Sequence, residues 1–313
     1  MMRANNKSDN IHIVDSLIDK IKETKNPTCV GLDTDFQYLP ESVQAKCKSL
    51  KDVSKAIFNF NAEIITKIKS VVPSVKVQIA YYEQYGLDGM QAFYDTLCLA
   101  KKGGLIVIAD AKRNDIGATA SCYSKAFLGQ TKVGSKVFKA FPSDFLTVNG
   151  YLGGDGIDPF LKDCSEFNKG IFVLVKTSNP SSGELQDKKF DTKETLFEAM
   201  GNLVNKWGKD SIGKYGYSKV GAVVGATHPT QAKVLREKLP NTFFLIPGYG
   251  AQGGSAEGLA VCFDNKALGG IVNNSRGILC AYKQDKYKGL SPANAAYAAS
   301  VDMQKDLAKA IGI

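Results

Sequence analysis

Short apolar runs that alternate with helical segments constrain the fold of this chain more than any other feature. Eight runs rich in β-branched residues recur along it: Cys29–Asp33, Val75–Ala80, Leu105–Asp110, Phe145–Asn149, Gly170–Val175, Val220–Ala226, Phe243–Pro247 and Gly270–Asn273. Most segments between them space their apolar residues as a helix does, for example Val53–Ile68. Alternating strands and helices form parallel sheets. Eight such units predict a (β/α)8 TIM barrel, with a doubly wound sheet as the alternative.

The second run indicates which way its side chains point. Val75, Val77 and Ile79 share one face of the expected strand, and Lys76 and Gln78 share the other. A barrel strand buries its outer face against helices, so Lys76 is predicted to point into the barrel. The alternative is an edge strand with a solvated lysine.

The chain is predicted to be a single barrel domain over residues 1–313, with loop insertions. Residues 1–10 are polar and are expected to form a flexible N-terminus. Gly153–Lys169 and Pro180–Lys193 are interpreted as insertions on the barrel. Because the runs end in polar residues, these ends are expected to converge on one rim of the barrel.

The seven cysteines favour a reducing compartment. They are scattered and none forms a C-x-x-C pair, so neither a disulfide framework nor a zinc site is indicated. No signal peptide is apparent at the N-terminus, and no apolar run approaches membrane-spanning length. We therefore expect a cytoplasmic protein that does not associate with membranes.

The charge and the histidine count limit the classes of function. The net charge is +9, but the 40 basic residues are spread along the chain without a dense cluster. This distribution favours steering of a small anion over nucleic-acid binding. The chain has only two histidines, His12 and His228, which supply a multi-histidine metal site or a Ser-His-Asp triad poorly. The histidine count therefore argues against a metal site.

The segment from Asp110 to Gly117 carries the strongest chemical signal. Asp110 ends the third apolar run, Lys112 lies two residues further on, and Asp115 follows in the loop or at the start of a helix. Side chains alternate along a strand, so Asp110 and Lys112 are predicted to share a face. A simpler interpretation makes Asp115 a helix cap and the other two a solvated ion pair. We favour a site, because a charge at the end of a buried strand is costly unless it is paired.

Two glycine-rich segments point to a phosphate site. Pro247–Gly254 follows the seventh run, and Asn273–Gly277, which contains Arg276, ends the eighth. The loops after the last two strands of a barrel often bind phosphate through backbone N–H groups, and an arginine adds a bidentate donor. No P-loop and no dinucleotide-binding motif is present.

These motifs resemble the orotidine 5′-phosphate decarboxylase family over nearly the whole chain, most closely its longer bacterial and apicomplexan type. The specific element is D-x-K-x-x-D after a strand, here Asp110, Lys112 and Asp115. Supporting segments are Gly31–Asp33, Val175–Pro180, Gly225–Pro229, Pro247–Gly254 and Ser275–Gly277. The resemblance implies a homodimeric barrel that converts orotidine monophosphate to UMP, the last step of de novo pyrimidine nucleotide synthesis, without metal or organic cofactor.

By the same resemblance, Lys76, Asp110, Lys112 and Asp115 match the family's catalytic charge network. The ammonium of Lys112 would stabilise the carbanion left by CO2 and then protonate it. Asp115, together with Ile116 and Thr119, would reach the site of the neighbouring subunit.

The resemblance also implies the contacts that bind substrate. Asp33 matches a ribose contact, Thr177 and Ser178 match contacts to the pyrimidine edge, and Gln252 and Arg276 match phosphate contacts. The nearest rival function is that of a Mg2+-dependent phosphosugar barrel, either a decarboxylase or an aldolase, which shares D-x-K-x-x-D. A rival of another class is an RNA-binding protein, for which the sequence lacks a clustered basic stripe.

Overall fold

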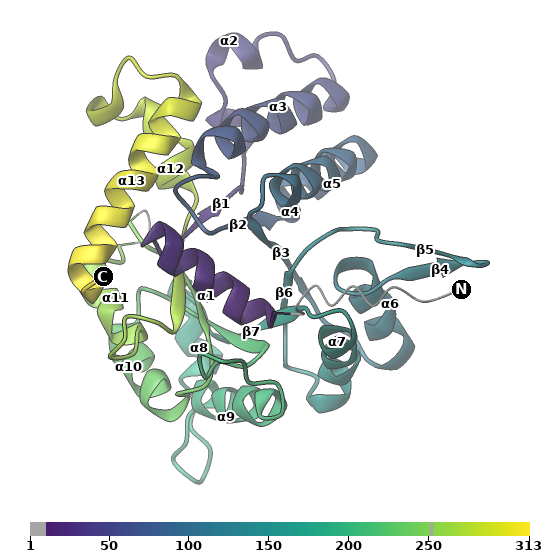
Figure 1. The fold of residues 1–313 in the computed structure, drawn as a ribbon, viewed down its shortest axis with the longest axis vertical. Helices are drawn as coiled ribbons and strands as arrows, with labels where there is room; N and C mark the ends of the chain where they lie inside the picture. The colour runs from purple at the N-terminus through teal and green to yellow at the C-terminus, as the bar shows by residue number, and fades with distance from the viewer. Residues whose placement is uncertain (1–10, 251–252) are drawn as a thin grey trace, which may run out of the picture.

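The computed structural model describes residues 11–250 and 253–313, and at its centre is a closed barrel of parallel strands in the order β1-β10-β9-β8-β7-β6-β3-β2 (Figure 1). The strands are β1 (Thr28–Gly31), β2 (Ser74–Gln78), β3 (Ile106–Arg113), β6 (Phe145–Val148), β7 (Gly170–Lys176), β8 (Val220–Val224), β9 (Phe244–Pro247) and β10 (Gly270–Asn274). Each coincides with one of the apolar runs. The TIM-barrel prediction is confirmed, and closure of the sheet between β1 and β10 rules out the doubly wound alternative.

A ring of helices surrounds the barrel (Figure 1). The long helices are α1 (Ile13–Thr24), α3 (Leu50–Ile68), α5 (Gly86–Lys102), α6 (Gly117–Phe127), α7 (Gly154–Glu166), α9 (Leu196–Gly208), α10 (Pro229–Lys238) and α13 (Pro292–Ile311). Short helices are α2 (Glu41–Gln44), α4 (Ala80–Glu83), α8 (Gly183–Gln186), α11 (Ala256–Leu259) and α12 (Arg276–Leu279), and 3-10 turns are η1 (Phe36–Tyr38), η2 (Pro180–Ser182), η3 (Ala260–Cys262), η4 (Ala281–Lys283) and η5 (Asp285–Tyr287). The last helix, α13, packs on α3 and completes the ring.

Helix α3 illustrates why these segments are helical. Its side chains Ile57, Phe60, Ile64 and Ile68 recur every three or four residues and are all buried. The hydroxyl of Ser49 accepts a hydrogen bond from the backbone N–H of Asp52 and so caps the first turn. The apolar stripe faces the sheet, and its burial is the main source of the helix's stability.

Two apolar clusters fill the molecule, one on each side of the sheet. The larger cluster lies between the strands and the outer helices and includes Val75 and Val77. The smaller one fills the barrel and includes Phe145 and Phe172, whose ring centroids lie 5.0 Å apart. Helix α1 packs its apolar face on this inner cluster and lies across the barrel (Figure 1).

Two details of the loops differ from the predictions. The interpretation of Gly153–Lys169 as an insertion is wrong, because most of it is α7, the helix between β6 and β7. Its glycines and Pro159 suggested a loop, whereas Ile157 and Phe160 are buried and pack it against the core. Pro180–Lys193 does lie outside the regular elements of the barrel and holds only η2 and α8.

A small antiparallel hairpin was not predicted. It consists of β4 (Thr131–Val133) and β5 (Lys136–Phe138), joined through Gly134 at φ 59° (Figure 1). Its strands of three residues are too short to give a periodic signal. The expected flexible N-terminus, residues 1–10, lies outside the described residues. In the described part of the chain, no helix is long and apolar enough to span a membrane.

Candidate active site

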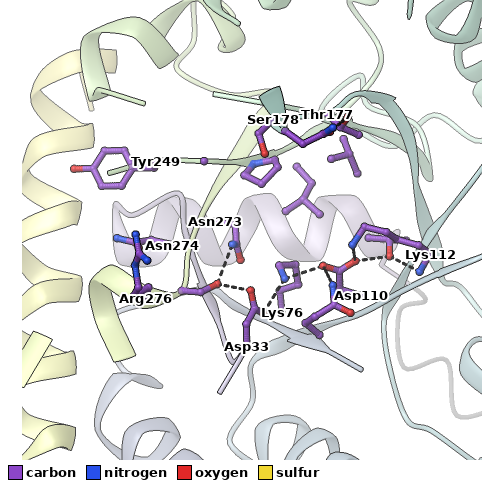
Figure 2. Close-up of a pocket in the computed structure, with 18 of the residues that line it drawn as sticks. Asp33, Lys76, Asp110, Lys112, Thr177, Ser178, Tyr249, Asn273, Asn274 and Arg276 are labelled. Atoms are coloured by element: carbon purple, nitrogen blue, oxygen red, sulfur yellow. Dashed lines mark hydrogen bonds and ion pairs between the residues drawn. The ribbon is translucent and has the colours of Figure 1, made fainter. Parts of the chain in front are cut away.

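A cavity of about 680 Å³ opens at the carboxyl ends of the barrel strands (Figure 2). Every strand, or the loop directly after it, contributes a lining residue: Asp33, Lys76, Asp110, Thr147, Leu174, Val223, Leu245 and Asn273. The expected convergence of the strand ends on one rim is therefore found, and α1 lies on the inner apolar cluster beneath them.

Four charged side chains form an alternating row along one wall (Figure 2). The Lys76 ammonium lies 3.0 Å from an Asp33 carboxylate oxygen and 2.8 Å from Asp110 Oδ2. The Lys112 ammonium lies 2.7 Å from Asp110 Oδ1. The side chains of Lys76 and Asp110 are only 5% and 8% exposed, whereas that of Lys112 is 46% exposed. The parity prediction that Lys76 points into the barrel is confirmed.

The row holds its two buried members, Lys76 and Asp110, in their charged forms. Burial alone would lower the pKa of Lys76, but Asp110 and Asp33 outweigh that effect and raise this pKa above its usual value. Burial alone would raise the pKa of Asp110, but Lys76 and Lys112 outweigh it and lower this pKa below its usual value. Both buried groups therefore stay ionised at neutral pH.

Asp110 is saturated with hydrogen bonds. Lys76 and Gln78 donate to its Oδ2, the Gln78 amide over 2.9 Å. Lys112 and the Thr147 hydroxyl donate to its Oδ1, the hydroxyl over 2.8 Å. A carboxylate accepts about four such bonds, so Asp110 has a donor for each lone pair and a fixed orientation.

Asp33 is held in a similar way at the other end of the row. The Ser275 hydroxyl donates to Asp33 Oδ2 over 2.7 Å. This contact depends on Gly31, because a Cβ there would lie 1.9 Å from the Ser275 oxygen. Glycine at position 31 thus lets β10 reach Asp33.

An irregular backbone at the end of β3, and not regular strand alternation, brings the Lys112 side chain to Asp110. The pairing of β3 with β6 shifts register between Ala109 and Arg113, and Lys112 has a left-handed backbone at φ 46°. Its backbone N–H donates to the Thr147 hydroxyl over 3.0 Å, which anchors this turn. Bulges of this kind redirect side chains next to functional sites. The shared position of Asp110 and Lys112 was predicted, but the bulge that produces it was not.

The opposite end of the cavity carries the expected anion-binding side chain. Arg276 follows β10 and lies far along the pocket from Lys112, beside Asn274 and Tyr249 (Figure 2). The Tyr249 hydroxyl donates to Asp306 of α13. Gln252, the other expected phosphate contact, lies outside the described residues.

Thr177 and Ser178 line a third side of the cavity, at the carboxyl end of β7 (Figure 2). The structure thus brings Asp33, Lys76, Asp110, Lys112, Thr177, Ser178 and Arg276 around one cavity.

Asp115, Ile116 and Thr119 do not join this group. None of the three is among the residues that line the cavity. Asp115 accepts a hydrogen bond from the backbone N–H of Ile116 over 2.8 Å, and Ile116 is 53% exposed just before α6. Within a single chain, therefore, the D-x-K-x-x-D motif supplies only Asp110 and Lys112 to the pocket.

Sequence reasoning missed Thr147 and Ser275, which orient the two carboxylates. Thr147 is a polar residue between Leu146 and Val148 in a buried strand, and this alternation is a signal that could have identified it. Ser275 carried no such signal, because its role depends on the close approach of Gly31. In residues 11–250 and 253–313, no three His, Cys, Asp or Glu side chains are grouped as metal ligands.

Comparisons with known proteins agree on one family. A sequence model described as the orotidine 5′-phosphate decarboxylase / HUMPS family matches residues 28–287. The chain is 44% identical over 306 residues to the orotidine 5′-phosphate decarboxylase of Caldicellulosiruptor bescii, with 96% of this chain and 99% of that protein covered. It is 40% identical over 306 residues to the same-named protein of Caldicellulosiruptor saccharolyticus, with the same coverage. A crystal structure of a putative orotidine-monophosphate-decarboxylase from Toxoplasma gondii superposes with a TM-score of 0.77 at 28% identity, covering 96% of this chain and 98% of that one.

The Asp110→Asn variant tests the charge row in the folded protein. Removing the negative charge between two ammonium groups should lower the free energy of unfolding by about 3 kcal/mol at pH 7. Because the pKa of Asp110 is lowered on folding, its stabilisation is present above the unfolded pKa of about 4 and fades as the pH falls through the native pKa. Urea unfolding between pH 7 and pH 2.5 should show that the difference in free energy of unfolding between the wild type and Asp110→Asn narrows below about pH 4.

The matched control for this experiment is Asp158→Asn, at an exposed position of α7. Its unfolding should follow the wild type at every pH. The stabilising role of the row would be contradicted if the free energies of unfolding of the wild type and Asp110→Asn differed little at pH 7, or if their difference widened in acid.

Proposed function

The chain belongs to the orotidine 5′-phosphate decarboxylase / HUMPS family, and we propose that it decarboxylates orotidine 5′-phosphate to UMP, the last step of de novo pyrimidine nucleotide synthesis. The relatives at 40–44% identity carry the name of this carboxy-lyase, which supports the decarboxylase branch of the family. The observation that carries the proposal is the alternating row Asp33–Lys76–Asp110–Lys112 on one wall of the cavity.

The two ends of the cavity suit the two ends of a nucleotide. Arg276 provides a cation for the phosphate. The family resemblance implies Gln252, which lies outside the described residues, as a second phosphate contact. Thr177 and Ser178 contact the edge of the pyrimidine, and Asp33 contacts the ribose. This arrangement leaves the reacting ring carbon beside Lys112. Binding energy from the distant phosphate then lowers the barrier at that carbon.

The chemistry explains why a lysine stands where it does. The bond between the ring carbon and the carboxylate breaks, its electron pair stays on the ring carbon, and CO2 leaves. The resulting carbanion is poorly delocalised, so a fixed cation at that carbon stabilises it as charge develops. The Lys112 ammonium takes this role, donates its proton to the carbon and regains a proton from solvent.

The other charges orient Lys112. Its ammonium is attached to Asp110, and Asp110 is in turn fixed by Lys76, Gln78 and Thr147. A cation held in place before the reaction needs little reorganisation as the transition state forms. The rate enhancement is therefore assigned to this preorganised row, without metal or organic cofactor.

The assembly we propose is a homodimer of single-domain chains. Asp115, Ile116 and Thr119 lie outside their own cavity, and Ile116 and Thr119 are exposed, which supports a contribution to the cavity of the second chain. All seven cysteines are free, which supports a reducing compartment such as the cytoplasm.

The direct test is to incubate the purified chain with orotidine 5′-phosphate and follow its ultraviolet absorbance, with and without EDTA. We expect complete conversion to UMP at the same rate in both samples, because no step of the proposed chemistry uses a metal. No conversion in either sample would refute the proposed function. Activity that is lost with EDTA and restored by Mg2+ would favour the chemistry of the related phosphosugar barrels.

The Lys112→Ala variant tests the role of its ammonium. We expect kcat/KM for orotidine 5′-phosphate to fall at least about 1000-fold, because the cation acts on charge that exists only in the transition state. The dissociation constant of UMP should stay within about fivefold of the wild type. Lys102→Ala, at the exposed end of α5, is the control and should behave as wild type. Near-normal turnover by Lys112→Ala would refute the assignment.

Mixing two inactive variants tests the shared site. Lys112→Ala and Asp115→Ala homodimers should each be nearly inactive. If Asp115 serves the other chain, a mixed dimer has one site with both lesions and one site with neither. With random pairing, about a quarter of all sites become wild type, so activity should rise to about a quarter of the wild-type value. No recovery after subunit exchange has been demonstrated would refute the shared site alone.

A further inference from the structure

A fully buried lysine that does not line the cavity stands at the end of β7. The Lys176 side chain has 0% exposure, and its ammonium lies 2.8 Å from a carboxylate oxygen of Asp187 and 3.3 Å from the Ser182 hydroxyl. A buried ammonium is costly, so the chain keeps this one only with a counter-charge. That counter-charge comes from the segment beyond η2 and α8, the insertion that follows Thr177 and Ser178.

A bulge determines where Lys176 points. The pairing of β7 with β8 shifts register between Leu174 and Lys176. Leu174 lines the cavity, whereas the Lys176 ammonium lies 5.9 Å from the centre of the Phe197 ring on α9, in the layer outside the sheet. Lys176 is therefore placed to act on the segment around it and not on a ligand in the cavity.

A second cross-link lies beside the first and joins the same two ends of this segment. The Gln186 side-chain oxygen accepts from the backbone N–H of Thr177 over 2.9 Å, and its amide donates to the Thr177 hydroxyl over 2.7 Å. The adjacent pairs Lys176–Asp187 and Thr177–Gln186 thus close residues 177–187 into a loop whose ends are fixed. Two cross-links at neighbouring positions restrict both the place and the direction of the residue that follows.

That residue is Ser178, which is also held by the loop that follows β8. The Thr227 hydroxyl donates to the Ser178 carbonyl oxygen over 3.2 Å. Gly225 permits this approach, because a Cβ there would lie 2.8 Å from the backbone N and Cα of Ser178. Held by these contacts, Ser178 lines the cavity (Figure 2).

We infer that Lys176 is a positioning residue for recognition of the base: paired with Asp187, it fixes the loop that presents Ser178 to the pyrimidine edge. This inference rests on the proposed function, which assigns Ser178 to the base. It makes Lys176 act through Ser178, without contact to the phosphate or the ribose. Loss of the pair should therefore weaken ligands that carry the base and spare those that lack it.

The experiment compares UMP with ribose 5-phosphate, which lacks the base. Calorimetry on the Lys176→Met variant should show the dissociation constant of UMP rising about tenfold, the size of one lost hydrogen bond. The constant of ribose 5-phosphate should stay within about twofold. The melting temperature should change little, because the Asp187 carboxylate that is left behind is 41% exposed and stays in contact with water.

Asp187→Asn is the second variant, and it reports on the pair even if Lys176→Met does not fold. The Asp187 side chain is 41% exposed, and the isosteric asparagine keeps a side-chain oxygen for Lys176 while it removes the counter-charge of this buried ammonium. It should show the same selective loss of UMP affinity. The matched control is Lys214→Met, which breaks the exposed 2.9 Å ion pair with Asp19 away from the cavity and should bind both ligands as wild type does.

A double variant identifies the residue through which Lys176 acts. In a Ser178→Ala background, Lys176→Met should cause no further loss of UMP affinity, because the positioned group is already gone. Three outcomes would overturn the inference. The first is a double variant whose loss of UMP affinity is the product of the two single losses. The others are equal weakening of UMP and ribose 5-phosphate, and unchanged UMP binding in both Lys176→Met and Asp187→Asn. In each of these cases a wild type that converts orotidine 5′-phosphate leaves the proposed function standing, whereas an inactive wild type refutes that function directly.

Discussion

The ion pairs of Lys76 are the interaction on which the rest of the site depends. A buried ammonium is costly unless it is paired, and Lys76 has two partners, the carboxylates of Asp33 and Asp110. The remaining contacts orient these two carboxylates. Gln78 and Thr147 satisfy Asp110, and Ser275 satisfies Asp33. The half-exposed Lys112 therefore pairs with a carboxylate whose orientation the protein already fixes, and this gives the Lys112 end of the cavity a fixed electrostatic field.

The barrel supplies these positions in two ways. Regular alternation is enough for Lys76, which lies between the outward-facing Val75 and Val77 of β2. It is not enough for the last residues of β3 and β7, where the register shifts, and there a bulge redirects the lysine. At β3 the bulge keeps Lys112 at the cavity, and at β7 it turns Lys176 into the layer beneath α9. A bulge at the end of a strand thus places one lysine in the cavity and the other outside the sheet.

These two mechanisms also explain how much could be predicted from the sequence. The apolar runs predicted the position of every barrel strand, and the alternation of side chains predicted that Lys76 points into the barrel. Both predictions succeed because burial of the two sheet faces determines the pattern of apolar residues. Bulges leave no periodic trace, so the left-handed turn at Lys112 could not be predicted. The glycines and proline of α7 concealed a helix that tertiary packing stabilises. Ser275 reaches Asp33 only because Gly31 lacks a side chain, which is a relation between two distant strands. Asp115 stays a prediction, since a second chain would have to supply its surroundings.

The two ends of the cavity differ in how they are supported, and the difference suits their tasks. The end proposed for the reaction rests on strand residues that are buried and hydrogen-bonded on several sides, so its geometry is set before a ligand enters. The end proposed for binding rests on segments beyond the strands: Ser178 follows β7, Tyr249 follows β9 and Arg276, the first residue of α12, follows β10. Loops adjust to a ligand at lower cost than strands do. A loop must nevertheless be fixed by further contacts where one of its residues has to distinguish between ligands. The buried pair of Lys176 with Asp187 provides such a contact beside Ser178, at the wall proposed for the base. On the proposed assignment, preorganisation is strongest where charge would develop and is added where recognition would require it.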